Sequence, residues 1–341
     1  MEEKKIRNMD ELATVIGISR PTLSKYFNDP TKVRSATRER IEAALDQYDY
    51  RPNMFAMNQN RRSTRNIGIV VPTIADPFFS EVVRHVEMRC TAAGYWPIVI
   101  PSHGATEQEL AALDTLRTLK LAGAVIAPLG ETSDVERLRQ FADETPTVLF
   151  DSYLDVGQTF VGNDNFNSIG LMVDYLCRTG QPPCFLDMPA VNLNASERRD
   201  AYTASMERLG HEPYVVPISR SNWNFEELGY EEGVRLISNR EFPSGTVLCA
   251  NDRMAIGLLA AAYSKGLRVG RGSGCAMRIA GHDDHPLARF TCPPLTTVAQ
   301  DYTAIAERSV ESLFALIDGN SGAAVPAIQK LEARLIIRDS A

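Results

Sequence analysis

Residues 13–25 read ATVIGISRPTLSK, and this stretch sets the fold class of the N-terminal region. Apolar residues recur at helical spacing from Met9 to Ile16, and Gly17 ends that helix. Ser19 is well placed to cap a second helix, whose first turn tolerates a proline. The small Ala13 lets the two helices cross closely, while the glycine makes the turn. The spacing therefore predicts a helix-turn-helix.

The start of the second helix carries the candidate DNA contacts. In a helix-turn-helix this helix enters the major groove, and its first residues meet base edges. We expect Arg20, Pro21 and Lys25 at the bases, with Thr22 and Ser24 near phosphates. Arg20 can form a bidentate pair with guanine, worth roughly 1–3 kcal/mol of discrimination. The alternative is that Arg20 and Lys25 are only solvated helix charges.

Charge is distributed unevenly along the chain. Residues 1–65, which also contain an expected third helix from about Ser35 to Tyr48, hold 13 Lys and Arg against nine Asp and Glu, a charge of +4. The remainder carries −11, which gives the formal net charge of −7. A small basic head on an acidic body suits a regulated nucleic-acid binder. A chance fluctuation in a short segment is the alternative.

Composition excludes several classes of protein. The 341 residues suffice for two or three domains, and 44% hydrophobic with 23% charged residues argues against wholesale disorder. No apolar run is long enough to span a bilayer, and no apolar core follows the charged N-terminus as in a signal peptide. The six cysteines are scattered without a C-x-x-C pair, so neither a disulfide framework nor a zinc ribbon is expected. We expect a cytoplasmic protein with no membrane association.

From residue 66 the chain alternates short β-rich runs with helical stretches, which predicts parallel sheets with helices on both faces. We expect strands at 67–72, 96–101, 123–128, 147–151, 184–188, 214–218, 246–250 and 278–282. We expect helices near 78–93, 106–120, 133–143, 166–179, 195–209, 225–239, 252–265 and 302–318. Two successive sets of four strands indicate two similar lobes with a cleft between them.

Polar and aromatic residues follow these strands, where parallel sheets bind their ligands. They are Asp76 to Phe79, Asn163 to Asn165, Arg198, Asn251-Asp252 and Asp283-Asp284. Carboxylate, amide and guanidinium groups satisfy vicinal hydroxyls, and aromatic rings cover a sugar face. The set indicates a sugar-binding cleft. Several alternatives stay open. Arg198 would equally hold a carboxylate or phosphate, and Asn251-Asp252 could be only a helix cap. Asp283 could be only a loop carboxylate, Phe78 only core and Trp223 only surface packing.

The same residues carry a family resemblance. The motifs are residues 13–25, Thr37-Arg-Glu-Arg-Ile41, Tyr50-Arg-Pro-Asn53, Asp76-Pro-Phe-Phe79, Asn251-Asp252, Gly281-His-Asp-Asp284 and Leu295-Thr-Thr-Val298. In this order they resemble the lactose-repressor (LacI/GalR) family of bacterial transcription regulators over nearly the whole chain.

The resemblance implies a fold of three parts. They are an all-α helix-turn-helix domain at 1–52, a hinge helix or linker at 53–65, and a two-lobed α/β effector-binding and dimerisation domain at 66–341. The third part is periplasmic-binding-protein-like, with parallel sheets. Lobe one would hold about 66–162 plus 293–322, and lobe two about 163–292 plus 323–341.

On DNA, the resemblance implies contacts from Arg20, Pro21, Thr22, Ser24, Lys25, Asn28, Thr37, Asn53, Ala56 and Gln59. In the family, a hinge helix enters the minor groove and a leucine wedges open the central base step. Gln59 stands at that position and is a poor apolar wedge. Gln59 could instead read minor-groove acceptors, or Met57 or Phe55 could supply the wedge. Two heads on a two-fold axis require a near-palindromic operator of double-stranded DNA.

In the cleft, the resemblance implies effector contacts from Phe79, Asn165, Arg198, Asn251 and Asp283, with Phe78 adjacent and Trp223 or Asn224 as a further contact. The effector would be a small metabolite, a sugar or sugar derivative, whose binding alters operator affinity. The family's tetramers use a C-terminal leucine-heptad helix, whereas this chain ends in the strand-like segment 333–337 and four further residues. We therefore expect a homodimeric transcriptional repressor.

Two other classes of protein share such a scaffold. A transporter's solute-binding protein is opposed by the absent signal peptide and the present head. A sugar-processing enzyme finds no support, because the sequence has no G-x-G-x-x-G, P-loop, G-x-S-x-G or metal-spaced histidine pair. The segment His282–His285 matches no common metal site and is expected to be a loop. We expect no catalytic residue, no cofactor and no metal.

Overall fold

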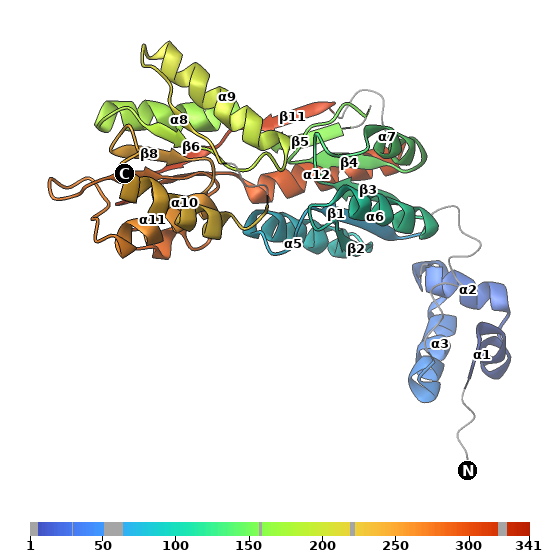
Figure 1. The fold of residues 1–341 in the computed structure, drawn as a ribbon. Coiled ribbons are helices and arrows are strands. Elements are labelled where there is room, and N and C mark those ends of the chain that lie inside the picture. Colours follow the sequence, from blue (N-terminus) through green and yellow to red (C-terminus); the bar gives the residue numbers. More distant parts are fainter. Residues whose placement is uncertain (1–5, 29, 51–63, 157–158, 219–221, 320–325) are drawn as a thin grey trace. The chain divides into compact units, whose positions relative to one another are not determined.

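The structure is a computed structural model that describes residues 6–28, 30–50, 64–156, 159–218, 222–319 and 326–341. The chain divides into two compact units, a head that extends to Thr64 and a body from Arg65 to Ala341 (Figure 1). No helix in the described ranges is long and apolar enough to cross a bilayer.

The described part of the head contains the three helices expected from the spacing. They are α1 (Met9–Ile16), α2 (Arg20–Asn28) and α3 (Ser35–Tyr48), with the 3₁₀ helix η1 (Pro30–Lys32) before α3. Gly17 ends α1 in the left-handed conformation at φ 69°, and Ser19 Oγ accepts a hydrogen bond of 3.3 Å from an amide in the first turn of α2. Leu12, Leu23 and Ile41 bring one fully buried side chain from each helix to a shared core. The predicted helix-turn-helix is confirmed.

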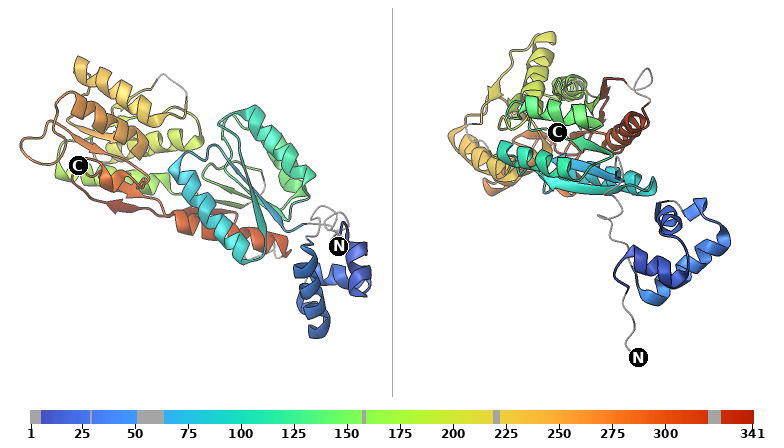
Figure 2. Two further views of the ribbon diagram at one scale, coloured as in Figure 1. Left: turned by 90° about the horizontal axis from the view of Figure 1, so that it is seen from below. Right: turned by 90° about the vertical axis from the view of Figure 1, so that its right-hand side faces the viewer.

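Lobe one of the body is built on a parallel sheet with strand order β11-β5-β4-β3-β1-β2. Its strands are β1 (Asn66–Val71), β2 (Trp96–Pro101), β3 (Gly123–Ile126), β4 (Thr147–Phe150), β5 (Thr159–Asn163) and β11 (Ile328–Leu331). Its helices are α5 (Pro77–Ala92) and α12 (Tyr302–Ile317) on one face, and α6 (Thr106–Thr118) and α7 (Val135–Glu144) on the other (Figure 2). Alternate strand residues enter the two cores, as Ile69 and Val70 do in β1, because successive side chains of a strand point to opposite faces.

Lobe two is built on a second parallel sheet with strand order β7-β6-β8-β9. Its strands are β6 (Cys184–Leu186), β7 (Val215–Val216), β8 (Thr246–Cys249) and β9 (Arg278–Ala280). Its helices are α8 (Asn165–Thr179), α9 (Leu193–Arg208), α10 (Phe225–Asn239) and α11 (Asp252–Ser264). Each of the eight strands and eight helices expected in the body is therefore present, with ends shifted by a few residues.

The C-terminal lobe boundaries differ from those expected. The expected range 323–341 of lobe two contains β11, yet β11 is an edge strand of the lobe-one sheet and pairs in parallel with β5. The expected range 293–322 of lobe one contains Leu295 and Val298, yet both lie in the core of lobe two. There β10 (Thr297–Ala299) pairs antiparallel with β12 (Arg334–Ile336). The alternation of helices and strands does not reveal which sheet edge a short late strand joins, because that choice depends on partners far along the chain.

The chain thus passes between the lobes three times. We call these passages the crossover segments: residues 163–165 between β5 and α8, 299–302 between β10 and α12, and 331–334 between β11 and β12. The last residue, Ala341, returns to the core of lobe two. Any movement of one lobe against the other must bend these three segments.

Candidate functional site

Helix α2 presents its first residues to solvent. Arg20, Pro21 and Lys25 are exposed, while Thr22 and Ser24 are half-buried. Arg20 Nε lies 3.3 Å from Asp10 Oδ1, and both side chains are about two-thirds exposed. An ion pair this exposed is weak, so the Arg20 guanidinium is available to another partner.

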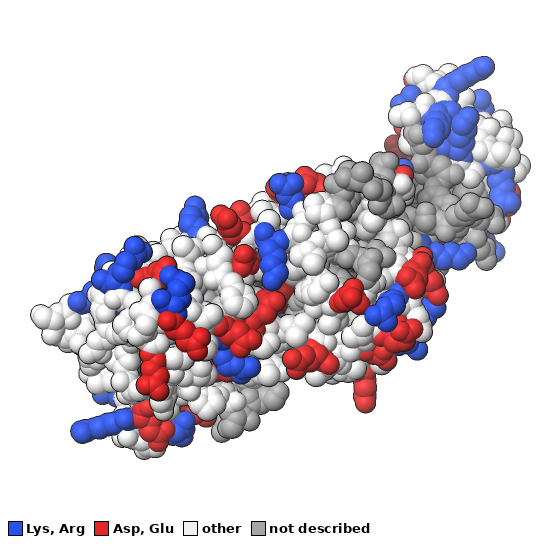
Figure 3. Space-filling model, turned by 90° about the horizontal axis from the view of Figure 1, so that it is seen from above, with Lys and Arg blue, Asp and Glu red and all other residues white. Residues whose placement is uncertain are grey.

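The other expected DNA contacts are only partly described. Thr37 is half-buried on α3. Asn28 ends α2, but its side chain lies outside the described residues, as do Asn53, Ala56 and Gln59. Lys and Arg side chains gather on the face of the head seen in Figure 3, whereas both charge signs mix on the body.

A small pocket lies between the two lobes at the carboxyl ends of both sheets. Its cavity measures about 30 Å³, room for about two water molecules. It is lined by Asp76, Phe78, Phe79, Asp151, Met188, Asn192, Asn194, Arg198, Trp223, Phe225, Asn251, Asp283 and Gln300. Of the seven positions expected to contact an effector, all but Asn165 are in this set. Asn165 is buried and bonded to Arg198.

Side chains that follow strand ends form the polar wall of the pocket. Asp76 follows β1 and Asp151 follows β4 in lobe one, while Asn251 follows β8 and Asp283 follows β9 in lobe two. Asp76 and Asn251 are also helix caps, with side-chain oxygens that accept backbone amides of α5 at 2.9 Å and of α11 at 2.8 Å. Asn251 is therefore both a cap and a pocket residue, so the two readings of the sequence are compatible.

Four aromatic rings form the apolar wall. The ring centroids of Phe78 and Phe79 lie 5.1 Å apart, those of Phe79 and Trp223 lie 6.2 Å apart, and those of Trp223 and Phe225 lie 5.8 Å apart. A Cβ built on Gly104 would lie 2.2 Å from the indole Nε1 of Trp223, so this lobe-two ring rests against a lobe-one loop. Phe78 and Phe79 belong to the lobe-one core as well as to the pocket wall.

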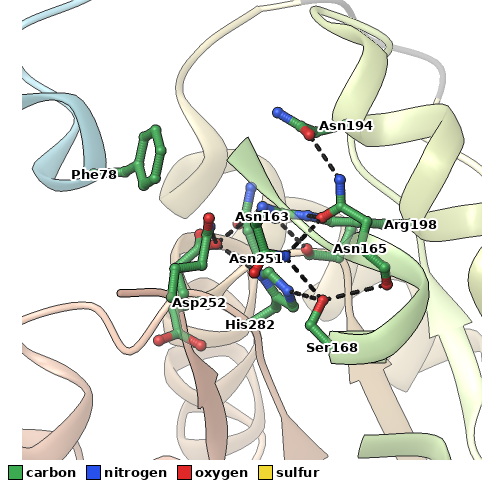
Figure 4. A network of polar contacts seen from close by, with 12 residues as sticks. Phe78, Asn163, Asn165, Ser168, Asn194, Arg198, Asn251, Asp252 and His282 are labelled. Atoms are coloured by element: carbon green, nitrogen blue, oxygen red, sulfur yellow. Dashed lines mark hydrogen bonds and ion pairs between the residues drawn. The ribbon is translucent and has the colours of Figure 1, made fainter. Parts of the chain in front are cut away.

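Arg198 joins the polar groups of the pocket (Figure 4). Its Nε donates to Asn165 Oδ1 at 3.3 Å, and its Nη2 donates to Asp283 Oδ1 at 3.1 Å. Asn165 Nδ2 donates to Asn194 Oδ1 at 2.8 Å, and Asn194 Nδ2 donates to Asp151 Oδ1 at 2.8 Å. Since the arginine charge is already balanced by Asp283, the pocket does not offer a free cation to a carboxylate or phosphate.

Two of the carboxylates that line the pocket differ in charge. Burial raises the pKa of Asp283, but Arg198, His282 and Gln300 more than offset it, so the pKa lies below the ordinary value. Burial and the nearby Asp283 raise the pKa of Asp151 to about 7, against the opposing effect of Arg198. Asp283 is therefore a charged acceptor, whereas Asp151 is close to neutralisation at physiological pH.

A second arginine connects the lobes beside the pocket. Arg253 of α11 donates from Nη1 to Asp76 Oδ2 of lobe one at 3.0 Å. The same guanidinium donates to both carboxylate oxygens of Glu226 at 2.7 and 2.6 Å, and it lies 4.9 Å from the ring centroid of Phe225. Arg253 and Asp76 are each about nine-tenths buried, so this ion pair is shielded from solvent.

Sequence reasoning missed part of the pocket. The lining residues outside the expected set are Asp76, Asp151, Met188, Asn192, Asn194, Phe225 and Gln300. Asp76 is among the polar residues noted after the first expected strand, though not as an effector contact, and Asp151 is the last residue of the expected strand 147–151, whereas Asn194 and Gln300 have no local signal. Of the two residues considered for one further contact, Trp223 lines the pocket, while Asn224 is exposed and donates to Glu227.

Segment 282–285 is a loop in which both histidines make hydrogen bonds. His282 bonds to Ser168 and Asp283, and His285 Nδ1 accepts from the Leu287 amide at 2.9 Å. Within the ranges that the structure describes, no group of three His, Cys, Asp or Glu side chains could hold a metal ion.

Two family models match the chain. Residues 8–53 match the family described as "Bacterial regulatory proteins, lacI family", and residues 179–341 match the "Periplasmic binding protein-like domain". The HTH-type transcriptional repressor CytR of Escherichia coli (strain K12) is 28% identical over 340 residues, which covers 97% of this chain and 95% of the relative. The ribose operon repressor of the same strain is 26% identical, covering 89% of this chain and 91% of the relative.

Among solved structures, the chain is similar to the lac repressor dimer bound to operator and the anti-inducer ONPF. The TM-score is 0.84 at 24% identity, and the match covers 98% of this chain and 99% of that one. The match extends over both the head and the body.

Proposed function

As a member of the lacI family of bacterial regulatory proteins, this chain is a DNA-binding transcriptional regulator, and we propose that a sugar or sugar derivative bound between its lobes sets its affinity for an operator. Its relatives are repressors rather than enzymes. It acts as a homodimer on a near-palindromic duplex, in the cytoplasm where that DNA lies.

The observation that carries the effector proposal is the composition of the pocket. Carboxylates and amides from the strand ends of both lobes face four aromatic rings, the combination that binds hydroxyl groups and covers an apolar sugar face. The cavity of about 30 Å³ is smaller than any monosaccharide, so the lobes must separate to admit one. Binding is thereby coupled to lobe movement, and a ligand that favours one lobe arrangement shifts the regulator toward it.

The proposed contacts follow from these two surfaces. The effector meets Phe78, Phe79, Arg198, Trp223, Asn251 and Asp283, with Asn165 holding Arg198 in place. The operator meets Arg20, Pro21, Thr22, Ser24 and Lys25 of α2, together with Asn28, Thr37, Asn53, Ala56 and Gln59.

Fluorescence anisotropy on a labelled promoter duplex tests the DNA proposal. The affinity is expected to fall steeply with salt, because each phosphate contact releases counterions. Arg20→Ala is expected to reduce discrimination between operator and scrambled duplex by about 1–3 kcal/mol. Arg235→Gln removes one charge from the body and serves as the control. A flat salt dependence, or unchanged discrimination in Arg20→Ala, would contradict the assignment.

A thermal-shift panel of pentoses, hexoses, disaccharides and nucleosides tests the effector proposal, because a ligand that binds only the folded state raises its stability. Asp283→Asn is expected to weaken the binding of a stabilising sugar at least about ten-fold, the loss of one hydrogen bond to a charged group. Operator binding of the same sample shows that the variant is folded. An undiminished sugar affinity would move the site elsewhere.

A further inference from the structure

Ser168 and His282 form a buried chain of hydrogen bonds behind the pocket (Figure 4). Both residues have no exposed surface. His282 Nε2 lies 2.8 Å from Ser168 Oγ, and His282 Nδ1 lies 2.8 Å from Asp283 Oδ1. Asn163 Nδ2 lies 3.0 Å from Ser168 Oγ. These hydrogen bonds therefore connect the first crossover segment to the Asp283 carboxylate in the pocket.

The donors and acceptors along these hydrogen bonds follow from the charge of Asp283. An ionised Asp283 can only accept, so Nδ1 of His282 carries the proton and donates to it. Burial and the neighbouring Arg198 lower the pKa of His282 to about 4, so the ring is neutral and Nε2 holds a lone pair. The Ser168 hydroxyl then donates to Nε2, its nearer acceptor at 2.8 Å, rather than to the Asn165 carbonyl oxygen at 3.2 Å, and it accepts from the Asn163 amide. The hydrogen bonds from Asn163 to Ser168, from Ser168 to His282 and from His282 to Asp283 then all point toward the Asp283 carboxylate.

These bonds orient the Asp283 carboxylate. Its Oδ1 accepts from Arg198 Nη2 at 3.1 Å, from His282 Nδ1 at 2.8 Å and from Gln300 Nε2 at 2.7 Å. No donor among the described residues reaches Oδ2, and Asp283 lines the pocket. With three donors on one oxygen, the carboxylate cannot rotate without breaking them, and the second oxygen is left for a ligand.

The same bonds reach two crossover segments. Asn163 belongs to the first and Gln300 to the second, and the Tyr302 hydroxyl, at the end of the second, donates to the Asp283 carbonyl oxygen. Any hinge motion that displaces these segments must therefore disturb the position of the carboxylate.

The order Ser–His–Asp also occurs in hydrolases, where the serine attacks a substrate. Ser168 is fully buried, does not line the pocket and already accepts a hydrogen bond, so no substrate can reach its oxygen. The geometry fits a positioning role instead.

We propose that Ser168 and His282 are positioning residues of the effector pocket, which hold Asp283 as an ionised acceptor and limit its partner to a hydroxyl or N–H donor of the effector. This proposal rests on the proposed role of Asp283 in effector binding. It makes this end of the pocket selective for donors and closed to anionic groups.

Nitrogen NMR of full-length protein with labelled histidine tests the first half of the proposal. Only five histidines are present, so a His282 variant assigns the resonance. The ring faces Arg198, Asp283 and Ser168. Because of this environment, we expect it to remain a neutral Nδ1–H tautomer between about pH 5 and pH 8. Ser168→Ala is expected to move the Nε2 resonance to that of an acceptor without a hydrogen bond. An Nε2–H tautomer, titration of the ring within this range, or an unmoved Nε2 resonance in Ser168→Ala would contradict the proposed order of hydrogen bonds.

Two His282 variants test the second half, because they separate the two ring nitrogens. His282→Asn keeps a donor near Nδ1 for Asp283, whereas His282→Gln keeps only a group near Nε2 for Ser168. The sugar that stabilises the wild type in the thermal-shift panel is expected to bind His282→Gln about ten-fold more weakly than His282→Asn. Equal affinities would overturn the positioning role.

His211 is half-buried and remote from the pocket, so His211→Gln is the control for replacing a histidine with glutamine. The NMR experiment needs neither sugar nor DNA. If no sugar in the panel binds, the effector proposal fails, and this positioning role fails with it, whatever the tautomer. If the operator is not bound but the tautomer and the two affinities are as expected, the positioning role stands while the DNA proposal falls.

Discussion

At the scale of single residues, the buried carboxylates of Asp283 and Glu109 differ in charge because the donors around them differ. Asp283 has three donors on one oxygen and stays ionised. Glu109 of α6 is the opposite case, with no exposed surface. Its Oε1 accepts from the Leu129 amide at 2.9 Å, but no hydrogen-bond partner among the described residues reaches Oε2. Burial raises the pKa of Glu109, so folding favours its neutral form.

Glu109 makes the stability of the body depend on pH. Because its pKa is higher in the folded state than the ordinary 4.5, the folded state binds more protons, and the free energy of unfolding falls as pH rises from about 4.5 through the folded-state pKa. Glu109→Gln has no ionisable group at this position, so its free energy of unfolding is expected to depend less on pH above about 4.5. Urea denaturation of the full chain at several pH values measures it. The exposed Glu107→Gln on the same helix is the control, and an equally steep profile in Glu109→Gln would contradict the assignment.

At the scale of elements, the crossing of α10 and α11 shapes one wall of the pocket. A Cβ on Gly257 would lie 2.1 Å from the carbonyl oxygen of Glu226, and one on Gly229 would lie 2.3 Å from that of Met254. The two backbones are therefore closer than any side chain permits. Helix α11 begins just after Asn251, so this contact sets where the pocket residues at its start lie.

Replacing a helical glycine with alanine adds one methyl group, and it distinguishes close backbone packing from helix propensity at this crossing. Gly257→Ala is expected to destabilise the body by about 1–3 kcal/mol or more, because the helices must move apart. Gly170→Ala is the matched control on α8, where the nearest atom to the new Cβ, Ser205 Oγ, lies 3.5 Å away. There the substitution is expected to stabilise by about 0.5–1 kcal/mol through helix propensity. Thermal unfolding compares the two, and shifts of the same sign would argue against close packing at Gly257.

At the scale of the whole body, the Arg253–Asp76 pair holds lobe two against lobe one. Both side chains are about nine-tenths buried, and Glu226 and Phe225 keep the guanidinium in place. This ion pair stabilises the lobe arrangement in which the pocket has a cavity of about 30 Å³. The strength of the pair therefore contributes to how readily the lobes part for a ligand, together with the Asn194–Asp151 hydrogen bond.

Removing the pair is expected to favour the open arrangement. Arg253→Gln loses a hydrogen bond between charged groups, worth about 1.5–3 kcal/mol. The chain has two tryptophans, so Trp96→Phe leaves Trp223, which rests against lobe one at Gly104, as a reporter of lobe separation. Its emission is expected to shift to longer wavelength in Arg253→Gln. Arg235→Gln, whose partners Glu232 and Glu241 lie in the same lobe, should leave the emission in place.

Local rules suffice for much of this architecture. The turn at Gly17, the cap at Ser19 and the alternation of strands and helices follow from preferences that act within a dozen residues. The same holds for Asn251 and Asp283, since a polar residue directly after a strand of a parallel sheet points to the ligand-binding edge.

Other features depend on contacts between residues far apart along the chain. Strand β11 joins the lobe-one sheet through β5, about 170 residues before it. Gln300 and Asn194 line the pocket only because the lobes meet there, and Ser168 reaches His282 across 114 positions. No local propensity records such pairings, because their energies come from the burial and hydrogen bonds that form when distant segments pack. The amino-acid order thus specified the elements and several pocket residues, while packing selected the sheet edge, the crossover segments and the charge state of each buried carboxylate.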